Sequence, residues 1–273
     1  MIFTGKYSSY YYPLIANSGY VSPKAHNLRE NSRRVNFPKG FDLEKSIFYA
    51  SLVDIAYTAY HEGDEVARKK IPKGFEVLDF FDIKDEKPDE MGYVLRKENE
   101  VFIPIRGTSN FSEWMDDFDA VQIDYPYARK SFFPWRRIKV HRGFLDSYRS
   151  FRDGLLRGVR KLEGVDTVYV LGHSLGAAIT TLCALDISKF QNVVMYNYAS
   201  PFVGNERFVK YYTSFVKRSY RIQNDKDIVP KVPPEIMGYK HIDSGIVLTG
   251  PDTINLEEQH SLHTYINLLQ KLK

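Results

Sequence analysis

The sequence predicts an α/β protein, in which helices cover both faces of a mostly parallel β-sheet. From about residue 144 onward, short runs of β-branched and aromatic residues alternate with longer segments whose apolar residues recur at helical spacing. This alternation is typical of parallel strands joined by crossover helices. The composition agrees, because 43% hydrophobic and 26% charged residues over 273 positions are ordinary for a globular protein with a sizeable core.

The expected elements can be placed in order along the chain. Residues 1–40 are rich in Tyr, Ser, Asn, Pro and Arg without a period, so we expect a surface arm there and a single domain over residues 41–273. A first helix is predicted over residues 41–60, with Asp42 as its N-cap and Tyr57 in its apolar stripe. The later elements are strands 75–81, 91–95 and 101–105, helix 144–162, strand 167–171, helix 177–187, strand 193–199, helix 206–216 and strand 220–222.

Charge, cysteine content and motifs exclude several classes of function. The formal net charge is +4 with both signs mixed along the chain, which gives no argument for nucleic-acid binding. The single cysteine, Cys183, excludes an intramolecular disulfide. The sequence has no H-E-x-x-H, no paired cysteines and no G-x-x-x-x-G-K-[ST]. It therefore predicts neither a metal nor a cofactor, and nothing in it indicates an obligate protein partner.

The cellular location is predicted only by default. The first residues show no basic segment followed by an apolar run, and no apolar run of 18 residues occurs in the sequence. With neither a signal peptide nor a transmembrane segment recognisable, the default expectation is a cytoplasmic protein.

A nucleophile is predicted at Gly172-His173-Ser174-Leu175-Gly176, which fits G-x-S-x-G. A buried-strand pattern runs into this motif and an apolar helical segment leaves it. So tight a turn strains its central residue and needs small residues on either side. We therefore expect Ser174 to be presented at the sheet edge, with the Leu175 N–H at a helix N-terminus where it can bind a developing oxyanion.

A carboxylate partner for Ser174 is expected after strand 220–222, since the acid follows a nucleophile of this kind in the chain and the histidine follows the acid. Asp225 and Asp227 compete for the role. Asp225 lies at an Asn-Asp turn, where a side chain commonly bonds its own backbone, whereas Asp227 precedes an apolar pair and a proline that fix its direction. We prefer Asp227.

Three histidines follow the acid, and their patterns separate them. His241 lies inside a strand-like stretch over residues 239–247, which favours a structural role. A terminal helix is predicted from Ser261 onward, with His263 on its polar face and Tyr265 in its apolar stripe. We expect His260 in a loop just before this helix, where its side chain can be directed at the nucleophile, and it is the expected general base.

A second oxyanion donor is expected after strand 101–105. Arg106-Gly107-Thr108 follows this strand and so lies at the same edge of the sheet as Ser174. Thr108 can supply both a backbone N–H and a hydroxyl. The alternative is a threonine that caps the next helix.

A family resemblance emerges from these and further motifs in chain order: Arg106-Gly107-Thr108, Trp114, His141-Arg142-Gly143-Phe144, the Ser174 turn, Ser200-Pro201-Phe202-Val203-Gly204-Asn205, Asp227-Ile228-Val229-Pro230, Pro233-Pro234 and His260. Over roughly residues 75–270 the chain resembles the class 3, fungal-type lipases, which are α/β-hydrolases. The resemblance implies a Ser174–Asp227–His260 triad, an oxyanion hole from Thr108 and Leu175, and hydrolysis of lipid esters at an interface. Two departures are a threonine where the family often has serine, and a cysteine count that excludes the many-disulfide pattern of secreted fungal members.

A short lid is predicted directly after Thr108. Large apolar residues recur there at helical spacing with acidic residues between them, which gives an amphipathic segment that could cover the acyl cleft in water and roll out at a lipid surface. The alternative is a fixed surface helix. The lid residues are Phe111, Trp114, Met115 and Phe118.

A second segment mixes aromatic and basic residues and is a candidate surface for lipid contact. Anionic headgroups attract basic residues, and aromatic rings suit the membrane interface. A connection whose rings belong to the core is an equally good interpretation. The residues are Phe132, Phe133, Trp135, Arg136 and Arg137.

The leading hypothesis from the sequence is a serine carboxylic-ester hydrolase, in first place a triacylglycerol lipase acting at a lipid–water interface. A phospholipase A1 or a feruloyl-type esterase is the enzymatic alternative, because a triad specifies the reaction and not the alcohol or acyl group. A lipid-binding protein without activity is the alternative from another class.

Overall fold

The main sheet has seven strands in the order β1-β2-β3-β6-β7-β9-β11. The computed structural model describes residues 35–83, 89–108, 119–128, 133, 136–243 and 245–273. Neighbours from β3 to β11 pair in parallel, and β1–β2 and β2–β3 pair antiparallel. The predicted α/β class is confirmed. The strands are β1 (Glu76–Ile83), β2 (Asp89–Lys97), β3 (Glu100–Ile105), β6 (Thr167–His173), β7 (Val193–Tyr198), β9 (Arg218–Asn224) and β11 (Ile246–Leu248).

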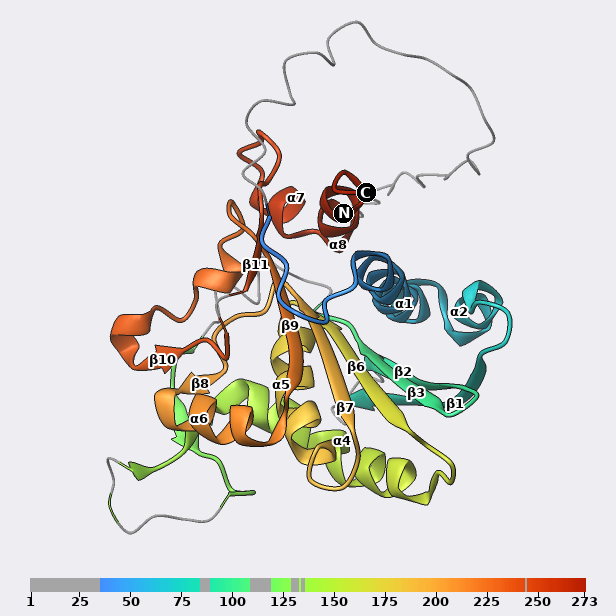
Figure 1. Cartoon of the computed structure of the whole chain (residues 1–273), viewed down its shortest axis with the longest axis horizontal. Coiled ribbons are helices and arrows are strands. Elements are labelled where there is room, and N and C mark those ends of the chain that lie inside the picture. The colour runs from blue at the N-terminus through green and yellow to red at the C-terminus, as the bar shows by residue number, and fades with distance from the viewer. Residues whose placement is uncertain (1–34, 84–88, 109–118, 129–132, 134–135, 244) are drawn as a thin grey trace, which may run out of the picture. The chain divides into compact units, whose positions relative to one another are not determined.

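Helices cover both faces of this sheet (Figure 1). One face, here the α1 face, packs against α1 (Leu43–Glu62) and α8 (Leu262–Gln270). The opposite face, here the α5 face, packs against α4 (Arg142–Lys161), α5 (Leu175–Ile187) and α6 (Glu206–Phe215). The shorter α2 (Asp64–Lys70) continues from α1.

Alternation along the strands divides the core between these two faces. On β3, Val101 and Ile103 pack into the α5-face cluster and Phe102 into the α1-face cluster. On β6, Val170 packs into the α5-face cluster and Tyr169 into the α1-face cluster. Because successive strand residues point to opposite sides, a sheet buried on both faces needs apolar residues at nearly every position.

Side chains cap the helices that the sequence predicts. Asp42 accepts the Lys45 N–H at 3.0 Å and starts α1, as expected. Asn205 accepts the Phe208 N–H at 2.9 Å and starts α6. Each cap satisfies a backbone donor that has no partner inside its helix, so the start of the helix is encoded locally.

A second, four-stranded antiparallel sheet in the order β10-β8-β5-β4 accompanies the main one. Its strands are two or three residues long, too short to show a period, and were not expected from the sequence. These strands, with short 3₁₀ helices that the described residues also form, are β4 (Gln122–Asp124), β5 (Lys139–His141), β8 (Gly204–Asn205), β10 (Tyr239–Lys240), η2 (Val229–Lys231) and η3 (Glu235–Met237).

The prediction of one strand-like stretch over residues 239–247 is wrong. This stretch holds β10 of the small sheet and β11 of the main sheet, with a turn between them. Asp243 accepts the Gly245 N–H at 2.9 Å and pairs with Arg221 at 3.1 Å. Gly245 has a φ of +74°, which glycine adopts without strain. The turn therefore redirects the chain from one sheet to the other.

The prediction that His260 lies in a loop is also wrong. His260 is the last residue of a short helix, α7 (Leu256–His260), and α8 begins two residues later. Asn255 caps α7 by accepting the N–H groups of Glu257 and Glu258. Five residues are too few to show an apolar period, which is why the sequence pattern did not indicate this helix.

Residues 35–273 form one compact unit. The proposed arm over residues 1–40 lies mostly outside the described residues, and its boundary stays a prediction. Within the described part, no helix is both long enough and apolar enough to cross a membrane.

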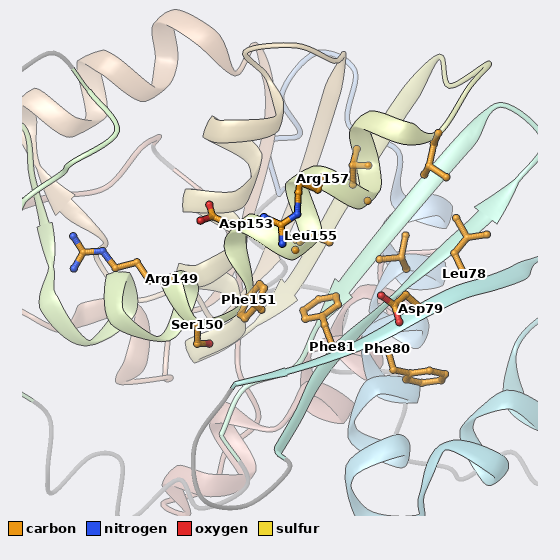
Figure 2. A pocket seen from close by; sticks show the side chains of 15 residues that line it. Leu78, Asp79, Phe80, Phe81, Arg149, Ser150, Phe151, Asp153, Leu155 and Arg157 are labelled. Atoms are coloured by element: carbon orange, nitrogen blue, oxygen red, sulfur yellow. The ribbon is translucent and has the colours of Figure 1, made fainter.

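A cavity of about 500 Å³ lies between β1 and α4 (Figure 2). The side chains of Phe81 and Phe151 point toward one another there, with 4.8 Å between their ring centroids. No residue of the predicted triad lines this cavity, so it is separate from the site described next.

Candidate active site

The predicted site residues come together at the carboxyl edge of the parallel strands. Ser174 follows β6, Gly107 and Thr108 follow β3, and Asp227 follows β9. His260 reaches the same edge from the end of α7. Neighbouring parallel strands end at one edge of a sheet, where α/β proteins place their chemistry.

Ser174 occupies a strained turn between β6 and α5. Its φ of 59° and ψ of −128° are unusual for a residue with a side chain. A Cβ at Gly172 would lie 2.7 Å from the Gly176 carbonyl oxygen, and one at Gly176 would overlap the Arg106 carbonyl oxygen. Only glycine fits at both positions, and the turn then projects the serine side chain out of the sheet edge.

A continuous chain of hydrogen bonds runs from Ser174 to Asp227. The Ser174 Oγ lies 2.7 Å from His260 Nε2, and His260 Nδ1 lies 2.9 Å from Asp227 Oδ2. The carboxylate also accepts the Val229 N–H at 2.9 Å and the Tyr265 hydroxyl at 2.7 Å. Because a carboxylate only accepts, His260 donates through Nδ1, and its Nε2 accepts the serine hydroxyl. This is the arrangement a general base needs.

The triad is closed off from solvent. Ser174, Asp227 and His260 have exposed fractions of 1%, 0% and 5%. Burial also raises the pKa of Tyr265 well above its ordinary value, and the neighbouring Asp227 adds to this effect. Tyr265 therefore stays protonated and keeps donating to the carboxylate.

The competing acid and one competing histidine lie elsewhere. Asp225 accepts the Gly250 N–H at 2.9 Å, so it serves the loop backbone. His263 is half exposed, with its ring 3.5 Å from the Asp54 carboxylate on α1. The contact with His260 Nδ1 is made by Asp227, and the contact with Ser174 Oγ is made by His260.

His241 has a structural role in the loop between the two sheets. Its Nε2 bonds the Pro230 carbonyl oxygen at 2.7 Å, and its ring stacks on Phe202 with 3.6 Å between centroids. Burial, together with the nearby charge of Arg221, lowers its pKa to about 3. A neutral histidine in these contacts holds the loop together.

The two expected oxyanion donors flank Ser174. A Cβ at Gly107 would lie 2.7 Å from Ser174 Cβ, so the segment that carries Thr108 runs directly beside the nucleophile. Leu175 is the first residue of α5, where a backbone N–H has no acceptor within the helix. The arrangement can present two N–H donors to a charge that develops on a substrate oxygen next to Ser174.

Two tyrosines at the site were missed by the sequence patterns, which placed both in apolar helix stripes. Tyr265 reaches Asp227, and Tyr57 reaches His173 Nδ1 at 2.7 Å. The signal that could have found them is chemical. A tyrosine on a buried face carries a hydroxyl that usually finds a hydrogen-bond partner.

The predicted lid and lipid-contact residues are only partly described. Phe111, Trp114, Met115 and Phe118 lie outside the described residues, as do Phe132 and Trp135. Phe133 is 43% exposed, with the Arg136 guanidinium 5.6 Å from its ring centroid. Arg137 pairs with Asp124 at 3.2 Å. Both the lid and the contact surface stay predictions.

Comparisons with known proteins agree with this geometry. The family described as Lipase (class 3) matches residues 102–237. The lipase of Rhizomucor miehei is 34% identical over 170 residues, which cover 58% of this chain and 45% of that relative. The secreted mono- and diacylglycerol lipase A of Penicillium cyclopium is 29% identical over 171 residues, which cover 60% of this chain and 53% of that relative. A solved structure of the Rhizomucor miehei triacylglyceride lipase has a TM-score of 0.65 and 27% identity, covering 80% of this chain and 83% of that one.

These findings correct one expectation and establish the family. The Penicillium relative is named as secreted, which overturns the default expectation of a cytoplasmic location.

The chain spans about half the length of the curated relatives that it matches. The family match takes in both the nucleophile turn and the acid loop, and the solved lipase shares the fold over four fifths of the chain. The chain therefore belongs to the class 3 lipase family of α/β-hydrolases.

Proposed function

We propose that the protein is a serine carboxylic-ester hydrolase that acts on acylglycerol esters at a lipid surface. The observation that carries the proposal is the chain of hydrogen bonds from Ser174 through His260 to Asp227. A protein that only binds lipid has no use for a buried serine in a strained turn bonded to a histidine–carboxylate pair. The strain at Ser174 is instead what a nucleophile at a strand–helix turn requires.

The chemistry follows from the positions of these atoms. His260 Nε2 takes the Ser174 proton while Oγ attacks the acyl carbonyl, and the resulting oxyanion is bound by donors of Thr108 and Leu175. The tetrahedral intermediate collapses, the alcohol leaves with the proton from His260, and an acyl-serine remains. Water, deprotonated by His260, then releases the carboxylic acid. Asp227 orients the imidazole and stabilises its cation.

Acylglycerols are the proposed substrate class because of the relatives and the site together. The Rhizomucor and Penicillium relatives are named lipase and mono- and diacylglycerol lipase. A panel of triacylglycerol, diacylglycerol, phospholipid, feruloyl ester and a soluble short-chain ester tests the class. Preference for acylglycerols supports the proposal. Faster hydrolysis of phospholipid would indicate a phospholipase A1 instead, and faster hydrolysis of feruloyl ester a feruloyl-type esterase.

The nucleophile and acid are tested by substitution with matched controls. Ser174→Ala abolishes ester hydrolysis and fluorophosphonate labelling while the circular dichroism spectrum stays unchanged. Asp227→Asn lowers kcat by about 10⁴, because His260 loses the acceptor that fixes its orientation. Asp225→Asn, in the same loop, keeps kcat within about threefold. Wild-type protein that binds lipid vesicles but takes no fluorophosphonate label would be a lipid-binding protein instead.

Transient contact with a lipid surface is part of the proposal. Ile254 is fully exposed and Leu256 half exposed on the segment that leads into α7 and His260. Apolar side chains in this position favour adsorption of the site's rim to lipid. Hydrolysis that rises more steeply than simple saturation above the solubility limit of the ester supports both this contact and the predicted lid. Replacing Trp114 and Phe118 by serine should flatten the rise, and hyperbolic wild-type kinetics would contradict the lid.

A further inference from the structure

The Tyr57 hydroxyl on α1 lies between the oxyanion segment and the nucleophile turn. The Gly107 N–H donates to it at 2.9 Å, and it lies 2.7 Å from His173 Nδ1. The other ring nitrogen of His173, Nε2, lies 2.8 Å from the carbonyl oxygen of His260. These contacts join residues that are 50, 116 and 87 positions apart.

The direction of each hydrogen bond follows from the chemistry of the groups. A backbone N–H can only donate, so the Tyr57 oxygen accepts from Gly107 and its own proton goes to His173 Nδ1. A carbonyl can only accept, so His173 Nε2 carries the proton donated to His260. A neutral imidazole has one donor and one acceptor, which matches both contacts. Burial, together with the nearby His260, lowers the pKa of His173 well below its ordinary value and keeps the ring neutral.

This network ties together the segments that the reaction requires. Gly107 directly precedes the oxyanion residue Thr108, His173 directly precedes Ser174, and the His260 backbone carries the base. A Cβ at Gly107 would lie 2.7 Å from both the Tyr57 hydroxyl and Ser174 Cβ, so Gly107 is clamped between these residues. Movement of the Tyr57 hydroxyl would therefore shift the oxyanion segment relative to the nucleophile.

We propose that Tyr57, acting through Gly107 and His173, is a positioning residue that holds the oxyanion donors in register with Ser174 and His260. This inference rests on the proposed ester hydrolysis, because it concerns the same site. Tyr57 is not a catalytic residue, since the hydroxyl is bonded to the protein on both sides. Its effect is on the transition state, in which the oxyanion must meet donors at the correct distance.

The first test is Tyr57→Phe, which removes only the hydroxyl. On a soluble short-chain ester, we expect kcat to fall about 10- to 100-fold and KM to change less than about threefold, because donors out of position weaken transition-state binding selectively. A boronic acid that forms a tetrahedral adduct on Ser174 should lose affinity by a similar factor. The pH at which kcat/KM is half-maximal should not move, because the Ser174–His260–Asp227 contacts remain.

Tyr93→Phe is the matched control. The buried Tyr93 hydroxyl on β2 donates at 2.5 Å to the carbonyl oxygen of Leu52 on α1, the helix that also carries Tyr57. Among the described residues, no hydrogen bond connects Tyr93 to the triad. Tyr93→Phe should lower thermal stability at least as much as Tyr57→Phe and leave kcat and boronic acid affinity unchanged. If Tyr57 had a purely structural role, the two variants would have the same kcat and the same boronic acid affinity.

His173 provides a second, independent test. In His173→Gln the amide oxygen can accept from Tyr57 and the amide N–H can donate to His260, so most of the activity should be kept. His173→Leu removes both bonds and should reproduce the loss seen in Tyr57→Phe. In the double variant that combines His173→Leu with Tyr57→Phe, kcat should fall by much less than the product of the two single-variant factors, because both substitutions break the same network.

The outcomes separate the positioning role from the proposed function. A wild-type protein that neither hydrolyses esters nor takes a fluorophosphonate label overturns both. A labelled, active wild type whose Tyr57→Phe variant matches Tyr93→Phe in kcat and boronic acid affinity overturns the positioning role alone. Multiplicative losses in the double variant would likewise overturn it.

Discussion

The two faces of the main sheet are covered by different kinds of side chain. The α5 face is mainly aliphatic, and its polar centre is Asp186, a buried carboxylate that holds α4 and α5 together. The α1 face is rich in tyrosine. Its buried tyrosines are Tyr49, Tyr93, Tyr169, Tyr196, Tyr198, Tyr220 and Tyr265, against Tyr125, Tyr148 and Tyr212 on the α5 face.

This difference shows how one layer can serve both packing and chemistry. A tyrosine buries a large ring and still carries a hydroxyl that must find a partner. On the α1 side, Tyr57 and Tyr265 find theirs at the active site, at His173 and Asp227. On the α5 face, Tyr125 and Tyr148 both donate to Asp186, away from the site. Substitution of a buried polar residue should therefore mainly lower stability on the α5 face and also lower kcat on the α1 side.

The largest expected loss of stability is on the α5 face, in Asp186→Asn. Asp186 is 1% exposed and accepts hydrogen bonds from Arg152 at 2.6 Å and Lys189 at 2.7 Å. Removing the charge leaves these cations without their buried partner, which costs about 3–5 kcal/mol of unfolding free energy. Urea denaturation measures the loss, and kcat of the folded fraction should stay within about twofold. A large fall in kcat would contradict the division between the faces.

The matched control for Asp186→Asn is Glu206→Gln. Glu206 pairs with Lys210 on α6, and both side chains are mostly exposed. Water screens an exposed pair of this kind and it contributes little to stability, so urea denaturation should show almost no change.

Acid should destabilise the protein through histidines that are buried neutral. Burial lowers the pKa of His141, which is 4% exposed, to about 4. The unfolded state then binds more protons below pH 6.5, so the stabilisation is full above that pH and is lost as the pH falls toward 4. Each such histidine adds a slope of about 1.4 kcal/mol per pH unit.

His141→Asn isolates this contribution. The His141 side chain accepts the Phe144 N–H at the start of α4, and asparagine can take over this capping role without titrating. Unfolding free energies should be measured at intervals from pH 7 to pH 4.5. In the variant they should fall less steeply with decreasing pH, by the amount that corresponds to about one proton taken up on unfolding. An unchanged slope would remove His141 from the explanation of acid sensitivity.

A smaller pair of effects sharpens the comparison between tyrosines on the two faces. Tyr265→Phe, on the α1 face, removes a donor to Asp227 and the acceptor of the Asn224 N–H, which should cost about 1–3 kcal/mol and lower kcat about tenfold. Tyr212→Phe, on the α5 face, removes a bond to the Met195 sulfur and should cost about 1 kcal/mol without changing kcat. Equal kcat values in the two variants would contradict a special role for the α1-side hydroxyls.

Sequence patterns were sufficient wherever the determining interactions are local. Alternation along strands and the cap at Asp42 depend on neighbours in the chain. Apart from the stretch over residues 239–247, the predicted strands and helices agree with the structure within a few residues. The Gly-flanked turn at Ser174 is local in the same sense. The preference for His260 over His263 used only the faces of the terminal helix, and the contact with Ser174 is indeed made by His260.

Tertiary structure alone decided how these pieces are held in register. The hydroxyls of Tyr57 and Tyr265 look like members of apolar stripes in the sequence, and their partners are 116 and 38 positions away. The small second sheet and α7 have too few residues to produce a period, and they form because neighbouring segments supply partners and caps. Local periodicity specifies which face of an element is apolar. Which polar group meets which across a buried interface depends on the packing of whole elements, and a short stretch of sequence does not contain that information.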